Sequence, residues 1–269
     1  MNRTLLAGGC SFTFGHELSD DENGKRPSSK TWSANLANAT GANYFSVAYP
    51  GTGNAGIARR VFEYIISNKQ EDLFVAVMWT FTSRYDWAMP RSAMLEKTRW
   101  ATITPWDTSD NQAEAQKAFG SSEPQLEIWK QRRENMQSTG VGPFADALYK
   151  HAANQYHETY LSWKNIVWLQ NVLEKKKIPY FFTLADNTLF WDEFKPLNEI
   201  DALLNGLYNE INFDKWFVFG ERQMGFNQWA WLNDYPRGTT HPLDAAHAVA
   251  AKLMKDKFLQ LYNKQQETL

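Results

Sequence analysis

Apolar residues gather in short runs separated by polar stretches, and the runs have the length of β-strands. The longest, residues 73–79, contains seven apolar side chains in succession. Short apolar runs bounded by turn residues are typical of strands that are buried on both faces. We therefore expect strands over residues 4–7, 43–48, 73–79 and 178–184, with 215–219 as a candidate fifth strand.

Between these runs, apolar residues recur every three to four positions, which is typical of amphipathic helices. In residues 54–68, for example, Ile57, Val61 and Ile65 fall on one face. Helices are expected over residues 31–39, 54–68, 155–175 and 242–264. Strands that alternate with helices predict an α/β protein with a parallel sheet covered on both faces.

The segment 84–153 does not follow this alternation. It is too long for a simple connection between two elements, and a long segment of this kind usually forms a lid or a binding surface. We interpret it as an inserted lid or subdomain, mostly helical towards its end, within a single domain that spans residues 1–269. We expect it to fold over the functional site and to contribute Trp87, Trp100 or Trp106 to the wall of that site.

Charge and composition narrow the class of protein. The 28 Lys and Arg residues nearly balance the 30 Asp and Glu residues, which argues against nucleic acid or an anionic membrane as a partner. The single Cys excludes an internal disulfide and a Cys-based zinc site, and we expect no metal or cofactor. The N-terminus lacks the features of a signal peptide, and no apolar run is long enough to span a membrane, so we expect a cytoplasmic protein. The oligomeric state does not follow from the sequence.

Groups able to carry chemistry follow the predicted strands. Ser11 comes after the first strand in Gly8-Gly9-Cys10-Ser11, Gly51 follows the second, Thr80 and Thr82 follow the third, and His241 precedes Pro242 at the start of the last helix. In a parallel sheet the carboxyl ends of the strands meet at one edge, where ligands bind. Each group also has a purely structural interpretation: Ser11 as a helix cap, Gly51 as a turn residue and His241 as a cap.

Taken together, these groups resemble the sequence blocks of the SGNH (GDSL-like) hydrolase family. Gly9-Cys10-Ser11 is similar to the family's Gly-Asp-Ser block, Gly51 to the Gly of its second block, and His241-Pro242 to the end of its last block. The resemblance implies a flavodoxin-like three-layer α/β/α sandwich and ester hydrolysis by a Ser–His–Asp triad. It makes Ser11 the nucleophile and His241 the general base.

The resemblance also implies an oxyanion hole formed by the backbone amides of Ser11 and Gly51. Asn54, Thr80 and Thr82 are the further candidates for oxyanion or substrate binding. The family's third block, Gly-x-Asn-Asp, is missing from this sequence, so Thr80 or Thr82 would have to replace its Asn.

The sequence departs from the family at the acid of the triad. The family's Asp lies three residues before the His, where this chain has Gly238. Asp234, seven residues before His241, is our candidate for the orienting acid, with Asp244 as the alternative. Loss of this carboxylate costs as much as ~10⁴ in rate in a serine triad.

These features predict a Ser-dependent hydrolase of an acyl ester. The aromatic content of 15% favours an O-acetylated carbohydrate as the substrate. One alternative is acyl transfer. Another is a catalytically weak binding module for a glycan or a larger assembly, and the missing Asp and Asn favour this second alternative. Cys10 is a second candidate nucleophile, although we expect a small buried thiol there.

Overall fold

A parallel sheet of four strands forms the centre of the molecule, in the order β2-β1-β3-β6. The strands are β1 (Thr4–Gly8), β2 (Asn43–Ser46), β3 (Leu73–Trp79) and β6 (Tyr180–Leu184). The structure is a computed structural model that describes residues 3–22, 24–68, 72–89, 100–119, 123–190, 201–220 and 224–266. The four strands predicted from the apolar runs are thus confirmed.

The expected fifth strand is reduced to a single point of pairing. Trp216 forms one parallel bridge with Phe182 of β6, and the Phe217 N–H donates to the Phe182 carbonyl at 2.8 Å. The strand order is that of a flavodoxin-like sheet, in which the order reverses between β1 and β3. That reversal point is where such sheets bind ligands.

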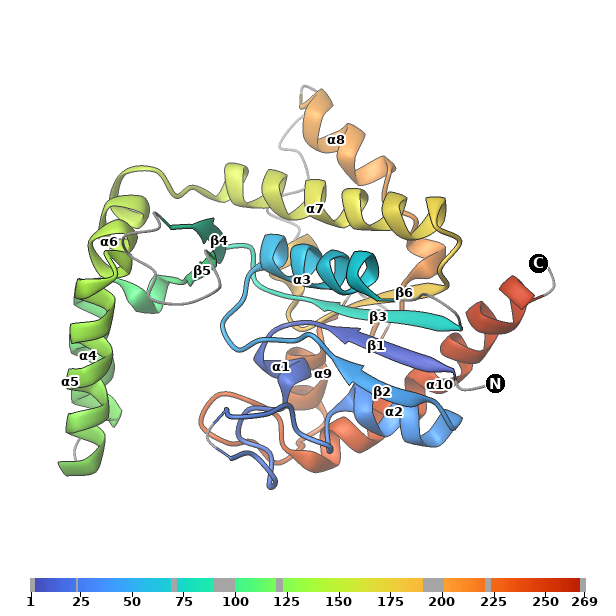
Figure 1. Cartoon of the computed structure of the whole chain (residues 1–269), viewed down its shortest axis with the longest axis horizontal. Helices are drawn as coiled ribbons and strands as arrows, with labels where there is room; N and C mark the ends of the chain where they lie inside the picture. The colour runs from blue at the N-terminus through green and yellow to red at the C-terminus, as the bar shows by residue number, and fades with distance from the viewer. Residues whose placement is uncertain are drawn as a thin grey trace.

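Helices cover both faces of the sheet (Figure 1). On one face lie α2 (Trp32–Thr40) and α10 (Asp244–Gln266), and on the other α3 (Asn54–Ser67) and α7 (Gln155–Lys175). Along β1, Leu5 and Ala7 enter the core beneath α2 and α10, whereas Leu6 enters the core beneath α3 and α7. This alternation follows from the period of two of a β-strand. The prediction of a parallel sheet between two helical layers is confirmed.

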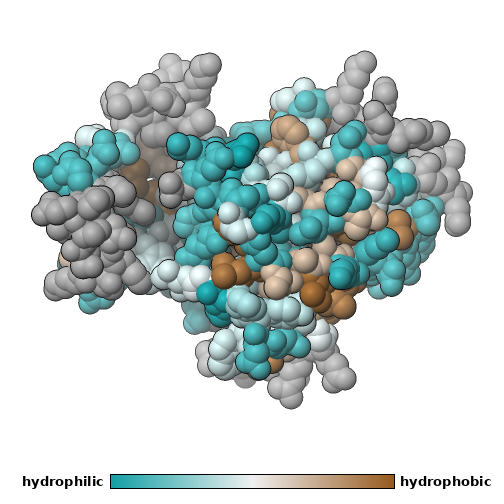
Figure 2. Space-filling model, turned by 90° about the horizontal axis from the view of Figure 1, so that it is seen from below, coloured by the Kyte–Doolittle hydropathy of each residue, from teal (hydrophilic) through white to brown (hydrophobic). Residues whose placement is uncertain are grey.

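The aromatic side chains divide between the core and the surface. Among the described residues, five Trp side chains are buried: Trp32, Trp79, Trp163, Trp216 and Trp229. Five others are exposed: Trp87, Trp100, Trp106, Trp168 and Trp231. Core packing therefore accounts for only part of the aromatic content. Viewed from the side of α2 and α10, the coloured surface in Figure 2 is mostly hydrophilic, with small separate apolar areas.

Between β3 and α7 the chain leaves the layers. It forms an antiparallel hairpin, β4 (Tyr85–Ala88) with β5 (Trp100–Ile103), and then the short helix η2 (Pro105–Asp107) and three α-helices: α4 (Ser109–Phe119), α5 (Glu123–Ser138) and α6 (Val141–His151). In Figure 1 these three helices stand away from the sheet, on the side where β1 and β3 end. The Asp86 carboxylate binds Arg59 of α3 at 2.7 Å and so attaches the hairpin to the main body.

The remaining elements are short: α1 (Ser11–Phe14), η3 (Asn187–Phe190), α8 (Ala202–Asn209), η5 (Phe213–Lys215) and α9 (Phe226–Leu232). Within the described ranges, no helix is both long and apolar enough to cross a membrane.

Candidate active site

Ser11 lies where the chain turns out of the sheet after β1. It is the first residue of α1, and Gly15 ends this helix in a left-handed conformation after a single turn. β1 pairs directly with β3, so the Ser11 loop lies beside the loop that follows Trp79. Ser11 is therefore at the reversal point of the strand order, as the carboxyl-edge argument predicts.

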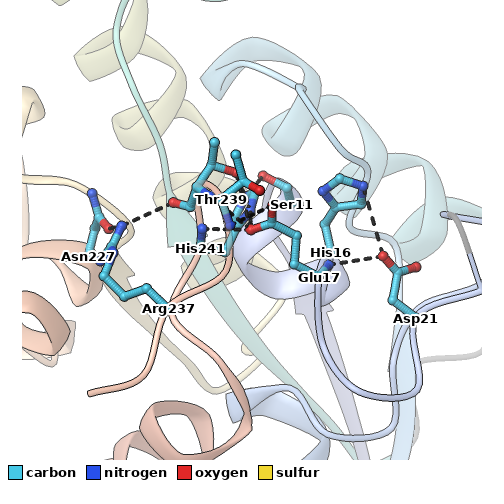
Figure 3. Close-up of polar contacts among 9 residues, drawn as sticks. Ser11, His16, Glu17, Asp21, Asn227, Arg237, Thr239 and His241 are labelled. Atoms are coloured by element: carbon cyan, nitrogen blue, oxygen red, sulfur yellow. Dashed lines mark hydrogen bonds and ion pairs between the residues drawn. The ribbon is translucent and has the colours of Figure 1, made fainter. Parts of the chain in front are cut away.

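His241 meets Ser11 across this edge. Its Nε2 lies 2.8 Å from Ser11 Oγ, although 230 residues separate the two in the chain (Figure 3). Both residues are 7% exposed. The ring of Phe12 packs against the imidazole with 4.6 Å between centroids. A hydroxyl within hydrogen-bond reach of a neutral imidazole has the geometry needed for general-base activation.

The other nitrogen of His241 faces Glu17, a residue that the sequence analysis did not select. Glu17 Oε2 lies 3.0 Å from His241 Nδ1, and Figure 3 shows the carboxylate between the imidazole and the loop after α1. Thr240 Oγ1 lies 2.7 Å from the same nitrogen. A proton on Nδ1 that is donated to the carboxylate leaves Nε2 free to accept from Ser11, which is the tautomer that a general base requires.

Backbone amides hold the Glu17 carboxylate in place. The N–H groups of Thr239, Thr240 and His241 donate to its two oxygens at 3.1, 3.0 and 2.8 Å. Glu17 itself has φ +69°, a left-handed conformation that is costly for a residue with a side chain and that is often found at functional sites. Its own N–H donates to Asp21 Oδ2 at 3.0 Å. The carboxylate is thus fixed from both sides of the site.

Gly238 explains the missing Asp. A Cβ at this position would lie 2.7 Å from Glu17 Oε2. The Glu17 carboxylate therefore occupies the space into which an Asp at 238 would project. The acid reaches His241 from the N-terminal loop instead of from the residues that precede the His.

The surroundings of the pair set its protonation. Burial lowers the pKa of His241 below its ordinary value of 6.5; Glu17 opposes this shift, and the charges of His16 and Arg84 add to it. Burial raises the pKa of Glu17, but hydrogen bonds from Thr240 and His241 outweigh this effect, so the net pKa of this carboxyl is lowered. At neutral pH the site therefore holds a neutral imidazole beside an ionised carboxylate.

Two backbone amides near Ser11 are free to bind a ligand. Within the described residues, the N–H groups of Ser11 and Gly51 have no hydrogen-bond acceptor. Gly51 has φ +77°, and its loop runs beside the Ser11 loop because the Tyr49 N–H donates to the Gly9 carbonyl at 3.1 Å. These are the two amides that we expect to form the oxyanion hole, and this role stays a prediction.

The other expected oxyanion donors differ from that expectation. Asn54 is buried, and its amide group bonds to both backbone groups of Thr80 at 2.8 and 3.0 Å and to the Ser162 hydroxyl at 3.0 Å. The Thr80 hydroxyl is fully buried and accepts from Arg84 Nη1 at 3.4 Å. Asn54 and Thr80 therefore fasten the end of β3 to the start of α3, whereas Thr82 is half-buried with no hydrogen bond among the described residues.

The expected acids also lie elsewhere. Asp234 is exposed in the turn after α9, and the carboxylate on His241 is Glu17, so the choice of Asp234 as the orienting acid is wrong. Asp244, the alternative, bonds to Ser19 and Lys30. Cys10 is fully buried in the core, as expected for a structural thiol.

The contribution of Trp87, Trp100 or Trp106 to the wall of the site stays a prediction. Trp87 packs against Phe144 of α6, and Trp100 lies under the Arg59 guanidinium. Trp106 is 60% exposed, and Trp129 has a side chain outside the described set. The hairpin approaches Gly51 through two methyl groups, those of Thr102 and Thr104, each 3.8 Å from the point where a Cβ on Gly51 would lie.

Glu17 escaped the sequence analysis because it lies in a polar loop, residues 16–30, that shows no periodicity. The sequence held one signal. Gly238 stands where the family has its Asp, so a triad in this chain needs a carboxylate from another segment to reach His241. No cluster of three or more metal-ligating side chains occurs among the residues that the structure describes.

Three solved structures are similar to this chain over most of its length. One is the psychrotrophic esterase EstA from Pseudoalteromonas sp., at 11% identity and a TM-score of 0.48, with 97% of this chain and 100% of that chain covered. A second is a carbohydrate esterase family 2 enzyme plus carbohydrate-binding domain from Corynascus thermopiles, at 12% identity and a TM-score of 0.45, with 98% and 67% covered. A third is a member of the lipolytic protein G-D-S-L family from Veillonella parvula, at 10% identity and a TM-score of 0.43, with 97% and 98% covered.

The sequence itself finds no match among protein-family models or among curated proteins. The three solved structures have identities of only 10–12% to this chain.

Proposed function

We propose that this protein is a serine hydrolase that cleaves an acyl ester through Ser11, His241 and Glu17. The observation that carries the proposal is the continuous series of contacts from Ser11 Oγ to His241 Nε2 at 2.8 Å and from His241 Nδ1 to Glu17 Oε2 at 3.0 Å. A purely structural His cap needs no hydroxyl on one nitrogen and no amide-bound carboxylate on the other. The arrangement is the one that a serine triad uses, with Glu in place of Asp.

The geometry supports the following reaction. Ser11 Oγ attacks the carbonyl carbon of the ester while its proton moves to His241 Nε2. The imidazolium that forms is stabilised by the ionised Glu17, and it then gives this proton to the alkoxide that leaves. Water, deprotonated by His241, next attacks the acyl-enzyme and releases the carboxylic acid together with a regenerated Ser11 hydroxyl.

The tetrahedral intermediates carry a negative oxygen, and the free amides of Ser11 and Gly51 are the donors we assign to it. Removal of one such donor typically costs about 10²–10³ in kcat. The loop after β3, residues 80–84, contains no Asn for a third contact with the oxyanion. Asn54, at the start of α3, is bonded to Thr80 instead.

The missing Asp and the missing Asn were the reasons to consider a catalytically weak binding module. Glu17 places a carboxylate on His241 and so supports the enzyme over the binding module, whereas the missing Asn has no counterpart that we assign. The substrate class within this proposal is an acyl ester. An O-acetylated carbohydrate is one candidate substrate, and segment 84–153 is the proposed lid because its hairpin packs beside the Gly51 loop.

A fluorophosphonate probe tests the proposal, because labelling requires an activated hydroxyl beside oxyanion donors. We expect the probe to label Ser11 and the protein to hydrolyse 4-nitrophenyl acetate. Ser11→Ala and His241→Ala should each abolish both to a similar extent, since the members of such a unit act together. Cys10→Ala is the matched control, because it removes a neighbouring nucleophile that is buried in the core.

Two results would contradict the proposal. An unmutated protein that is neither labelled nor active on simple or acetylated-sugar esters would indicate a binding module. Loss of labelling in Cys10→Ala alone would assign the nucleophile to the thiol.

A further inference from the structure

A cationic side chain, Arg84, lies at the same edge of the sheet as the catalytic pair. It follows β3, the strand that pairs with β1 and so ends beside Ser11; Gly8 of β1 is in register with Val77 of β3. The space beyond these two strands is the reversal point of the sheet, where ligands bind. Arg84 therefore belongs to the loop that leaves the sheet beside the region that a substrate of Ser11 must enter.

Aromatic rings connect the guanidinium to the catalytic His. The Arg84 guanidinium lies 4.6 Å from the centre of the Phe81 ring. Phe81 packs on Phe12 with 6.4 Å between centroids, and Phe12 packs on His241 at 4.6 Å. Burial is the main cause of the lowered pKa of His241, and the positive charge of Arg84 adds to it.

The backbone that carries Arg84 is held firmly. A Cβ on Gly53 would collide with the Arg84 carbonyl, so the loop of Gly51 packs directly on the chain at this point. The Tyr149 hydroxyl of α6 donates to the Ser83 carbonyl at 2.6 Å. The guanidinium thus projects from a fixed position between the main body and segment 84–153.

No carboxylate within the described residues neutralises Arg84. Its hydrogen-bond acceptor there is the Thr80 hydroxyl, at 3.4 Å. Glu17 is occupied by His241 and by backbone amides, and Asp86 pairs with Arg59. A half-buried guanidinium without a counter-charge loses hydration that no ion pair replaces. Its planar set of donors suits a carboxylate or a phosphate.

We propose that Arg84 is a substrate-recognition residue that binds an anionic group of the substrate outside the ester that is cleaved, so that the preferred substrates are anionic esters. This inference rests on the proposed hydrolase function. The anionic group can belong to the acyl part or to the alcohol part of the ester, and the two sources are separated by the choice of test substrates.

Matched pairs of esters test the inference. The first pair, 4-acetoxybenzoate and its methyl ester, places or removes a negative charge on the alcohol side. The second pair, 4-nitrophenyl hydrogen adipate and 4-nitrophenyl methyl adipate, does so on the acyl side. Arg84→Gln should lower kcat/KM for the anionic member of one pair by roughly 10- to 100-fold, the range for a hydrogen bond to a charged group, mainly by raising KM. The neutral member should change less than about threefold.

Two variants serve as controls. Arg84→Lys retains the charge without the planar donors and should keep part of the preference for the anion. Arg26→Gln removes an exposed Arg that pairs with Glu22, and it should leave the preference unchanged. Added salt should weaken the preference of the unmutated protein, because charge attraction is screened.

Three results would overturn the inference. The first is that Arg84→Gln leaves kcat/KM unchanged for both pairs of esters. The second is that Arg84→Gln lowers kcat equally for neutral and anionic members, which would place Arg84 at the oxyanion instead. Calorimetric binding to Ser11→Ala keeps this test separate from the hydrolase proposal. In that background 4-acetoxybenzoate or the adipate monoanion should bind, its neutral partner should bind more weakly, and Arg84→Gln should remove the difference. Equal binding of anionic and neutral members would overturn the inference even if esterase activity is established.

Discussion

Glu17 and Gly238 share one small space beside the His241 imidazole. Glu17 Oε2 lies 3.0 Å from His241 Nδ1 and 2.7 Å from the point where a Cβ on Gly238 would stand. A side chain at 238 and a carboxylate at 17 therefore exclude each other. The Gly that first indicated a defective triad is the residue that leaves room for the acid.

Replacement of Glu17 should impair turnover while Ser11 stays in place. Glu17→Gln removes the charge that stabilises the imidazolium and permits the wrong tautomer of His241, so kcat for 4-nitrophenyl acetate should fall by up to ~10⁴. In Glu17→Asp, kcat should fall less than in Glu17→Gln, because Asp keeps the negative charge. If Glu17→Gln retains full activity at neutral pH, Glu17 is not the orienting acid.

Moving the acid to position 238 should restore activity. Glu17→Gly removes the carboxylate and tolerates φ +69°, and Gly238 is outside the left-handed region, so an Asp fits its backbone. We expect Gly238→Asp alone to lower kcat, because its side chain collides with Glu17. The same change in the Glu17→Gly background should raise kcat at least tenfold, toward the unmutated value. Gly238→Asn in that background is the uncharged control, and equal recovery with Asn would contradict a role for the charge.

The acidic limb of the pH–rate profile should lie below pH 6.5. Hydrolysis needs neutral His241, and burial lowers the pKa of this residue, so kcat/KM should fall only as the pH drops through that lowered value. Glu17 opposes the shift, and the limb of Glu17→Gln should therefore move to still lower pH. NMR titration of the His241 ring checks the assignment. A limb above pH 6.5, or one that moves upward in Glu17→Gln, would be incompatible with this account.

Gly51 should matter for activity more than for stability. Gly51 and Gly41 both have left-handed φ values, +77° and +66°, and a Cβ at either position meets no atom closer than 3.8 Å. Ala at each should lower the free energy of unfolding by about 1–2 kcal/mol. Only Gly51→Ala should also reduce kcat, by about 10–10³-fold, because it alone turns an amide that we assign to the oxyanion. Similar kcat values for the two variants would remove Gly51 from the oxyanion hole.

His247 should make the fold sensitive to acid. Its Nδ1 accepts from the Trp32 N–H at 3.0 Å, and complete burial lowers its pKa to about 3. Between that value and 6.5 the unfolded chain binds one more proton than the folded chain. Stability should therefore fall by about 1.4 kcal/mol per unit as the pH drops through this window.

His247→Asn tests this contribution because an Asn side-chain oxygen can still accept from Trp32. Urea unfolding at several pH values should show a shallower slope between pH 6 and 4 for this variant. A uniform loss of stability with an unchanged slope would show that another group is responsible.

Periodicity carried the prediction of the fold. The seven-residue run of β3 and the one-sided helices required no tertiary information, and the carboxyl-edge rule was enough to bring Ser11 and His241 together. The candidate fifth strand, residues 215–219, forms only one bridge, between Trp216 and Phe182. Its pairing with β6 depends on how the two segments meet in space, which the apolar pattern of residues 215–219 does not show.

The acid and the oxyanion donors depended on features that no local pattern shows. The position of the Glu17 carboxylate depends on a positive φ at Glu17 and on hydrogen bonds from a distant turn. This turn contains His241, which is 224 residues away in the sequence. Asn54 looked available for a ligand, but a buried amide must satisfy its own hydrogen bonds, and those of Thr80 were within reach.

The placement of Glu17 also affects the order in which the site is assembled during folding. Ser11 and Glu17 belong to one short peptide that a single turn of helix and a Gly can shape locally. His241 reaches them only when α10 has docked, because Pro242 leads directly into α10, which packs on α2 at the surface of the sheet. Closure of that long loop is slow compared with local structure. A chain in which α10 has not yet docked would therefore carry the shaped Ser11 loop without His241, and the proposed hydrolytic activity would appear only after that docking.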